Sequence, residues 1–347
     1  MQQPASDSNS TINVTLSVLM AVHNGSKHLR EAIDSILQQS FSDFEFIIVD
    51  DGSTDDSGEI ITSYDDPRIQ LIRKERAGLP AALNAGLLVC RGQFIARMDA
   101  DDISEPNRLG VELTWLMSHP DTHIVCSDVT IIDSNGSVVG SASMRPYDNS
   151  LIRDGLLFLR SVKPIVHPSV MIRREVYVRL GGYRDYRHAE DHDLWLRAVD
   201  LFHFERINSM LLRYRIHPNG VSYKSAIQQA TSSCMSVINY RIHRALEIDL
   251  FTQHPAVFLR IELHVKRRIE TYIAPARVDL SIAKSQLRGG SIFGGAWTIL
   301  SGMIKHGLNV LPWENMRSMA KITTDVERKL IVAYKNDSLE DLARWLS

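Results

Sequence analysis

Short apolar runs alternate with amphipathic segments along the first half of the chain, and this alternation constrains the fold more than any other feature. Apolar runs that predict strands lie at residues 16–22, 45–49, 68–73, 93–98 and 123–132. Segments typical of helices lie between them, at residues 27–39, 79–89 and 105–119. Strands and helices that alternate at this spacing indicate a mostly parallel sheet with crossover helices on its faces. We therefore predict an α/β fold.

The 347 residues exceed one domain of ordinary size, and we predict a boundary near residue 224. Residues 1–13 are polar and are expected to be a disordered leader. Residues 14–224 carry the strand–helix pattern, whereas residues 225–347 predict helices alone. Residues 225–347 contain 16 Lys and Arg against 11 Asp and Glu, although the whole chain has a net charge of −2. A basic region on an acidic body favours an anionic surface or partner for that region.

Several classes of protein are excluded by what the sequence lacks. Its three cysteines, Cys90, Cys126 and Cys234, are widely spaced, which indicates neither a zinc site nor a disulfide framework and favours a reducing, cytoplasmic location. The sequence has no run of 18 uncharged apolar residues, so we predict no membrane-spanning helix. There is no Gly-Lys dipeptide and no G-x-G-x-x-G after the first strand, which excludes a Walker A loop and disfavours a dinucleotide fold. A phosphate ligand would therefore have to be held through a metal ion.

Acidic residues follow two of the predicted strands. They are Asp50 and Asp51 after one strand, and Asp99, Asp101 and Asp102 after another. Ligands bind beyond the carboxyl ends of parallel strands, so both clusters should open onto one edge of the sheet. Carboxylates suit Mg²⁺ or Mn²⁺, which often bridge them to substrate phosphates. The alternative for the first cluster is ordinary helix capping, but a cap needs one acid and the second cluster has three.

Five segments, in the same order and at the same spacing, resemble the family 2 glycosyltransferases. They read LSVLMAVHNG, FEFIIVDDGSTDDS, AGLPAALNAGL, GQFIARMDADD and GGYRDYRHAEDHDLWLRA, and the resemblance covers about residues 14–223. The resemblance implies a GT-A fold and transfer of a sugar, with inversion, from a nucleotide-sugar donor. We expect a UDP-sugar as donor and a glycan or lipid-linked acceptor, as in bacterial surface polysaccharide synthesis, and no nucleic-acid partner.

The resemblance also implies roles for individual residues. The nucleotide-sugar-binding residues it implies are Ala21, His23, Asp50, Asp51, Asp99, Gly182 and Glu190. The implied ligands of Mn²⁺ or Mg²⁺ are Asp99, Asp101 and His217, with Asp101 expected as the direct ligand. The implied catalytic base is Asp191.

The chemistry of the reaction agrees with one base of this kind. An inverting transfer needs a single group to take the proton of the acceptor hydroxyl as it attacks. A carboxylate at the start of a helix is more easily kept ionised, although Asp191 alone could equally be a helix cap. Asp193 and Arg197 are spaced for an ordinary surface ion pair, and Trp195 is expected in the core.

The C-terminal region leaves two interpretations open. Residues 258–268 combine apolar positions with a basic cluster, and residues 291–313 are apolar and rich in glycine. One interpretation is peripheral contact with an anionic membrane, at the inner face of the inner membrane. The other, which we favour, is helices that pack against the catalytic domain or against a second copy in a homo-oligomer.

Two other functions compete with the interpretation as a glycosyltransferase. A phosphotransferase with Asp99 as nucleophile would leave the acids of residues 50–51 and the Glu190–Asp191 pair unexplained. A non-catalytic nucleotide-sugar-binding scaffold is disfavoured because an acid stands at every motif position.

Overall fold

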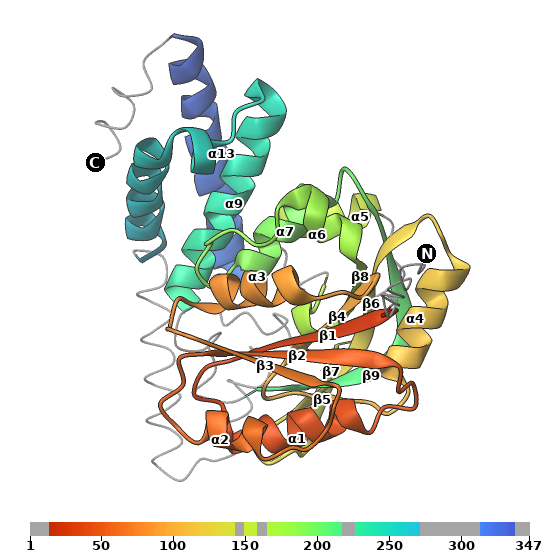
Figure 1. Ribbon diagram of the computed structural model, residues 1–347. Coiled ribbons are helices and arrows are strands. Elements are labelled where there is room, and N and C mark those ends of the chain that lie inside the picture. The colour runs from red at the N-terminus through yellow and green to blue at the C-terminus, as the bar shows by residue number, and fades with distance from the viewer. Residues whose placement is uncertain (1–13, 143–148, 158–164, 217–225, 271–312, 337–347) are drawn as a thin grey trace, which may run out of the picture.

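The computed structural model describes residues 14–142, 149–157, 165–216, 226–270 and 313–336. Within these ranges the strands form one sheet of nine, ordered β3-β2-β1-β4-β8-β6-β9-β5, with β7 paired to β6 (Figure 1). The strands are β1 (Leu16–Val22), β2 (Phe44–Asp51), β3 (Ile69–Lys74), β4 (Phe94–Asp99), β5 (Ile103–Ser104), β6 (Thr122–Ile132), β7 (Val138–Ala142), β8 (Val170–Arg173) and β9 (His203–Arg215). The sheet is parallel from β3 to β4, and β8 joins β4 to β6 through antiparallel pairs. The predicted α/β class is confirmed, and the complete sheet is mixed.

Helices cover both faces of the sheet. They are α1 (Ser26–Leu37), α2 (Ser57–Thr62), α3 (Leu79–Val89), α4 (Arg108–Ser118), α5 (Asn149–Leu157), α6 (Arg174–Leu180) and α7 (Glu190–Ala198). Figure 1 shows α1 and α2 on one face and α3, α6 and α7 on the other.

Alternate residues of each central strand enter two separate cores. In β1, Leu19 packs with the core under α3 and α7, whereas Val18 and Met20 pack with the core under α1 and α4. A strand buried on both faces has no polar side, which is why β1, β2 and β4 read as continuous apolar runs. Because successive side chains of a strand point to opposite faces, only every second side chain near a strand end lies on the face that carries α7.

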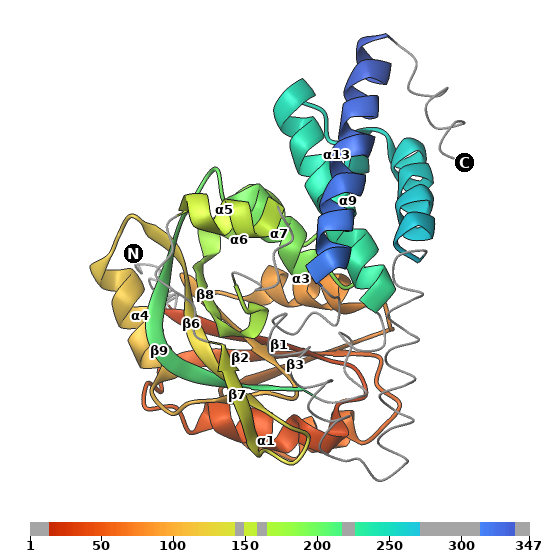
Figure 2. The ribbon, with the colours of Figure 1, turned by 180° about the vertical axis from the view of Figure 1, so that it is seen from behind.

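The C-terminal helices stand together beside α7. They are α9 (Ala226–Leu246), α10 (Leu250–Gln253), a helix over residues 255–270, and α13 (Trp313–Lys335). Helix α9 packs against α7, and α13 lies along α9 (Figure 2). Buried residues of these helices, such as Val237, Ile261 and Val326, belong to the core under α3 and α7. The helical character expected of residues 225–347 is therefore confirmed where they are described.

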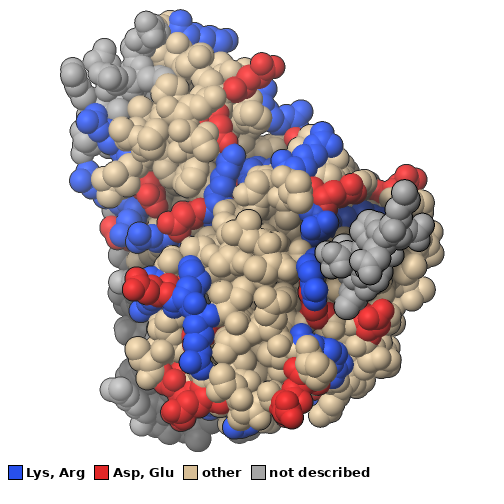
Figure 3. Space-filling model, in the orientation of Figure 1, with Lys and Arg blue, Asp and Glu red and all other residues tan. Residues whose placement is uncertain are grey.

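Other expectations for this region remain open. The leader of residues 1–13 and most of the segment 291–313 lie outside the described residues, and the boundary near residue 224 stays a prediction. In the described ranges no helix has both the length and the apolarity needed to cross a bilayer. Figure 3 shows basic and acidic side chains interspersed over one face of the C-terminal helices.

Candidate active site

The carboxyl ends of β2, β1 and β4 lie side by side and bring the two acidic clusters to one edge. Ala21 of β1 is in register with Val49 of β2 on one side and with Asp99 of β4 on the other. One residue further on, Val22 is in register with Asp50. The prediction that both clusters open onto the same edge is confirmed, and a single strand separates them.

Asp51 is buried and holds the turn that precedes α3. Its Oδ1 accepts the amide of Ala77 at 2.9 Å, and its Oδ2 accepts the amide of Gly78 at 2.7 Å. Lys74 Nζ lies 3.5 Å from the same carboxylate. Asp50, also buried, accepts the amide of its neighbour Ser53 at 2.9 Å. Each carboxylate oxygen keeps further lone pairs, so a ligand contact by Asp51 stays a prediction.

His23 fixes the loop after β1 against the end of β2. Its Nδ1 lies 2.9 Å from the Asp51 carbonyl oxygen, which can only accept, so Nδ1 donates; its Nε2 lies 3.4 Å from the Asn24 side-chain amide nitrogen. The next residue, Asn24, has a φ of 53° and accepts the amide of Thr54 at 2.8 Å. A left-handed Asn held by hydrogen bonds is a local strain of the kind that clusters at functional sites.

The acids after β4 form a cluster suited to a cation. Asp99, Asp101 and Asp102 each offer one carboxylate oxygen, and these oxygens lie within 4.8 Å of one another. Asp102 is almost fully buried; its Oδ1 accepts the amide of Arg215 at 2.7 Å, and its Oδ2 has no hydrogen-bond partner among the described residues. Burial first, and then the charges of Asp101 and Asp99, raise the pKa of Asp102 well above its ordinary value.

This donor set fits Mg²⁺ or Mn²⁺. Both ions take hard oxygen ligands, and a divalent charge relieves the repulsion among neighbouring carboxylates. Asp102 extends the predicted pair of Asp99 and Asp101. The third predicted ligand, His217, lies outside the described residues, so its role stays a prediction.

Arg215, at the end of β9, clamps the acidic loop from the side of α1. Its Nε donates to the backbone oxygen of Asp101 at 2.7 Å, and its Nη1 donates to the backbone oxygen of Asp133 at 3.2 Å. Its Nη2 lies 2.5 Å from Glu31 Oε2 of α1. The side chain is 1% exposed. Sequence reasoning missed this residue because its partners lie far away along the chain.

Arg97 of β4 is a second buried cation at the site. It lies two residues before Asp99, on the same face of the strand, forms an ion pair with Asp99 and is 1% exposed. Burial lowers the pKa of Arg97, but the charges of Asp99, Tyr183 and Glu190 outweigh that effect and raise it. An arginine inside the apolar run FIARM was the available signal, and sequence reasoning passed over it.

Glu190 and Asp191 open α7 and are both buried. Asp191 Oδ1 accepts the amide of His192 at 2.8 Å, within the first turn, where the helix dipole favours a negative charge. Burial, Asp101 and Asp191 all raise the pKa of Asp99, which Arg97 opposes. The role of Asp191 as the base stays a prediction.

The prediction of a surface pair between Asp193 and Arg197 is wrong in one respect. The two side chains do pair, with Arg197 Nε 2.8 Å from Asp193 Oδ2, but Asp193 is 3% exposed and Arg197 13%. Arg197 also donates to the backbone oxygens of Leu180 at 2.7 Å and Gly182 at 2.9 Å. Helix α7 packs between α6 and α9, so its i,i+4 pair is enclosed rather than exposed.

The Gly181–Gly182 turn fits tightly against α3. Both glycines are left-handed, with φ of 70° and 74°, and a Cβ on Gly182 would lie 2.5 Å from Asn84 Oδ1. Asn84 also bridges both backbone groups of Tyr183, at 2.8 Å each. This packing accounts for glycine at position 182, and a contact of Gly182 with a donor sugar stays a prediction.

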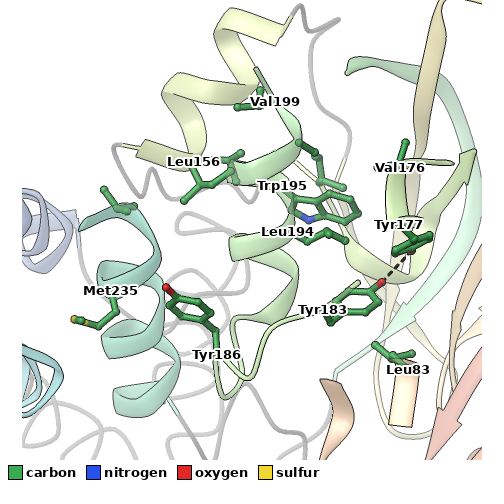
Figure 4. Close-up of a cluster of buried hydrophobic side chains, with 14 of the residues drawn as sticks. Leu83, Leu156, Val176, Tyr177, Tyr183, Tyr186, Leu194, Trp195, Val199 and Met235 are labelled. Atoms are coloured by element: carbon green, nitrogen blue, oxygen red, sulfur yellow. Dashed lines mark hydrogen bonds between the residues drawn. The ribbon is translucent and has the colours of Figure 1, made fainter. Parts of the chain in front are cut away.

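A buried polar chain lies beneath the start of α7. His167, to which the sequence assigned no role, has its Nε2 2.8 Å from the Tyr183 hydroxyl, which lies 3.0 Å from the Tyr177 hydroxyl. Figure 4 shows the two tyrosines joined in this way beside Trp195. Trp195 is 1% exposed, as predicted for a core residue, and its ring lies edge-on to that of His167 at 5.9 Å.

Comparison with known proteins agrees with this geometry. A family model described as glycosyl transferase family 2 matches residues 17–181. An uncharacterized glycosyltransferase of Methanocaldococcus jannaschii is 34% identical over 220 residues, which cover 62% of this chain and 74% of the relative. The O-antigen biosynthesis glycosyltransferase WbnJ of Escherichia coli is 33% identical over 220 residues, which cover 61% of this chain and 83% of the relative.

Solved structures extend the likeness of fold to nearly the whole chain. Residues 1–349 of TarS from S. aureus, in complex with UDP-GlcNAc, give a TM-score of 0.52 at 17% identity, over 88% of this chain and 90% of that one. The mannosyltransferase PcManGT from Pyrobaculum calidifontis, in complex with GDP-Man and Mn²⁺, gives 0.53 at 16% identity, over 91% and 88%. The expected GT-A fold is thereby confirmed. With the acids at the ends of β2 and β4 inside the matched segment, the chain belongs to glycosyltransferase family 2.

Proposed function

We propose that this glycosyltransferase moves a sugar from a nucleoside-diphosphate sugar to a hydroxyl of a glycan or lipid-linked acceptor, in synthesis of a bacterial surface polysaccharide. The Escherichia coli relative WbnJ is an O-antigen biosynthesis glycosyltransferase, which supports this class of product. One observation carries the proposal: carboxylate oxygens of Asp99, Asp101 and Asp102 lie within 4.8 Å of one another directly after β4, at the sheet edge that Asp50 and Asp51 of β2 also reach. A group of acids in this place can hold a divalent ion against the diphosphate of a donor.

Asp191 is the base in this proposal. The acceptor oxygen attacks the anomeric carbon while Asp191 takes its proton, and the bond from that carbon to the diphosphate oxygen breaks on the opposite side. One displacement of this kind inverts the configuration. The position of Asp191 in the first turn of α7 supports the role, because the helix dipole stabilises the carboxylate before it takes the proton.

Asp99, Asp101 and Asp102 would hold Mg²⁺ or Mn²⁺, which supplies positive charge to the leaving diphosphate as a Lewis acid. The protein's own contribution is to keep these three carboxylates in place. Arg215 fixes the backbone of the loop through the Asp101 carbonyl oxygen. Arg97 forms an ion pair with Asp99, which keeps the Asp99 carboxylate oriented at the end of β4.

The nucleotide would lie at the ends of β1 and β2. His23 fixes the loop after β1 at this edge, and Asp51 has lone pairs beyond those that hold the turn before α3. We propose a UDP-sugar as donor. The complexes of TarS with UDP-GlcNAc and of PcManGT with GDP-Man make the UDP- and GDP-sugars the first two to compare.

Two measurements test the proposal. The first is a thermal-shift panel of UDP-, GDP-, dTDP- and CMP-sugars, each with Mn²⁺, with Mg²⁺ and with chelator. A ligand that binds the folded state raises the melting temperature. We expect a shift with one diphosphate donor class that disappears with chelator. A shift that is the same with and without metal would contradict the role of the three acids.

The second measurement is turnover of Asp191→Asn with the donor that the panel identifies. We expect donor binding to be retained and turnover to fall by at least about a hundredfold, the scale for loss of a general base. Asp185→Asn, which removes an exposed acid from the loop before α7, is the matched control and should keep its turnover. Turnover that survives Asp191→Asn would refute the assignment of the base.

A further inference from the structure

The loop between α6 and α7, residues 181–189, leads directly into Glu190 and Asp191 and is anchored by the C-terminal helices. Arg184 of this loop forms an ion pair with Asp249, the residue that caps α10. Asp249 is itself fixed, because its Oδ1 accepts the side-chain amide of Asn239 of α9 at 3.2 Å and the backbone amide of Thr252 at 3.3 Å. The carboxylate that pairs with Arg184 is thus held by hydrogen bonds from both α9 and α10.

A cluster of aromatic rings forms the second anchor. Tyr186 is 3% exposed, and its ring stacks on that of Phe251 with centroids 5.0 Å apart and planes 22° apart. Phe258 lies edge-on to Tyr186, at 5.6 Å. Figure 4 shows Tyr186 facing the helix that carries Met235. Aromatic pairs in these geometries contribute attraction beyond the apolar area that they bury.

The third anchor is on α7 itself, next to the proposed base. His192 Nε2 donates to the Leu156 backbone oxygen at 3.1 Å, and His192 Nδ1 lies 2.7 Å from the Ser236 hydroxyl of α9, which is also 2.9 Å from the Ser233 backbone oxygen. This hydrogen bond joins the residue after Asp191 to the C-terminal region. Three different kinds of contact therefore connect the segment 184–192 to α9, α10 and the helix of residues 255–270.

The loop has a conformation that needs such support. Gly181, Gly182 and His188 all have positive φ, and for His188, at 62°, this is an uncommon backbone state. Two backbone hydrogen bonds within the loop fix its turns. The Tyr186 amide donates to the Arg184 oxygen at 2.8 Å, and the Ala189 amide donates to the Tyr186 oxygen at 2.9 Å. These local turns fix the shape of the loop, but its placement over the sheet depends on what it packs against.

We propose that the C-terminal helices position the catalytic base. Asp249, through Arg184, and the rings of Phe251 and Phe258, through Tyr186, hold the loop in place. The inference rests on the proposed role of Asp191. Displacement of a catalytic group by about 1 Å can cost about a hundredfold in rate. The donor-binding acids at the ends of β2 and β4 belong to other elements and keep their own supports.

The first test compares Asp249→Asn with the parent enzyme in turnover and in donor binding. Asparagine keeps an oxygen for the cap and loses the charge that pairs with Arg184. We expect kcat to fall about tenfold or more, with donor affinity within about twofold of the parent value. Asp325→Asn is the matched control, because Asp325 pairs with Arg268 and Lys329 in the same helical region, away from the loop. Equal kcat in Asp249→Asn and the parent would overturn the proposal.

Two further variants keep the test decisive if Asp249→Asn folds poorly. Tyr186→Phe should be silent, because the buried Tyr186 hydroxyl has no hydrogen-bond partner among the described residues. Tyr186→Leu should lower kcat and leave donor affinity unchanged, because it removes the ring contacts. Loss of donor affinity in parallel with kcat would indicate general unfolding and count against a positioning role.

Hydrogen–deuterium exchange separates failure of this inference from failure of the proposed function. In Asp249→Asn, amides of residues 184–192 should exchange at least about tenfold faster, while those of β1 and β4 keep the parent rates. This readout needs no substrate. Unchanged exchange in residues 184–192 overturns the anchoring whatever the activity, whereas faster exchange in an enzyme whose Asp191→Asn variant stays active refutes the base and leaves the anchoring intact.

Discussion

Glu112 and Arg108 form an ion pair within α4 that solvent does not reach. From this pair we predict how the free energy of unfolding changes with pH. Arg108 Nε lies 3.1 Å from Glu112 Oε1, and both side chains are 0% exposed. Arg108 also donates to the Arg97 backbone oxygen at 2.9 Å, so the pair supports β4 below the active site. Burial raises the pKa of Glu112 from 4.5 to about 7, although Arg108 opposes the shift.

The sign of the effect follows from the two pKa values. The folded pKa of Glu112 is higher than its unfolded pKa, so the folded state binds the proton more tightly and Glu112 favours folding at low pH. This contribution is lost as the pH rises from 4.5 through about 7. One pKa unit corresponds to about 1.4 kcal/mol, so the full loss is about 3 kcal/mol, of which about 2.5 kcal/mol falls between roughly pH 5 and pH 8.

Glu112→Gln isolates this contribution, because glutamine keeps the shape of the side chain and cannot ionise. The unfolding free energy of variant and parent is measured by urea denaturation at intervals from pH 5 to pH 8. The variant should gain stability relative to the parent by about 2.5 kcal/mol over this range. Glu75→Gln, which removes an exposed carboxylate, is the control. A difference between Glu112→Gln and the parent that does not change with pH would refute the reasoning, because it would mean that Arg108 keeps Glu112 ionised throughout.

Three further substitutions test the supports of the site. Arg97→Gln should lower the unfolding free energy by about 3 kcal/mol in urea denaturation, because it leaves a carboxylate without its buried partner. Arg215→Met should raise the Mn²⁺ concentration needed for half-maximal activity by about tenfold to a hundredfold, whereas Arg213→Met, which breaks an exposed pair two residues earlier on β9, should not. Gly182→Ala should lower the melting temperature by several degrees, because a methyl group would meet Asn84 at 2.5 Å and φ is +74°. An unchanged metal requirement in Arg215→Met, or an unchanged melting temperature in Gly182→Ala, would contradict these assignments.

The parts of the fold that sequence predicts are those in which a local pattern is enough. Strands β1, β2 and β4 are buried on both faces, so each reads as a largely apolar run, and the runs of β2 and β4 end at Asp50 and Asp99. The parallel order then places Asp50 and Asp99 on one edge without further information. The pairing of Asp193 with Arg197 follows from helical spacing, but their burial does not, because it depends on where α6 and α9 pack.

The parts that sequence does not predict depend on contacts between distant segments. Arg215 bonds to the backbone near Asp101 and to Glu31, and nothing near Arg215 in the chain marks these partners. The stacking of Tyr186 on Phe251 likewise joins two regions that the sequence assigns to different domains. Such contacts are set by packing of the finished fold, which a pattern of residue types does not encode.

The charges of the acids after β4 and of the two arginines beside them support the proposal that this site holds a cation. Arg97 neutralises Asp99 in part, but Arg215 directs its side chain to backbone oxygens and to Glu31 rather than to the Asp102 carboxylate. The pKa of Asp102 is well above its ordinary value, chiefly because this side chain is buried. A fold selected only for stability would have replaced such acids with neutral residues, since an uncompensated buried charge is costly. Two arginines that hold the acids in position and neutralise only part of their charge fit the proposed site for a divalent ion.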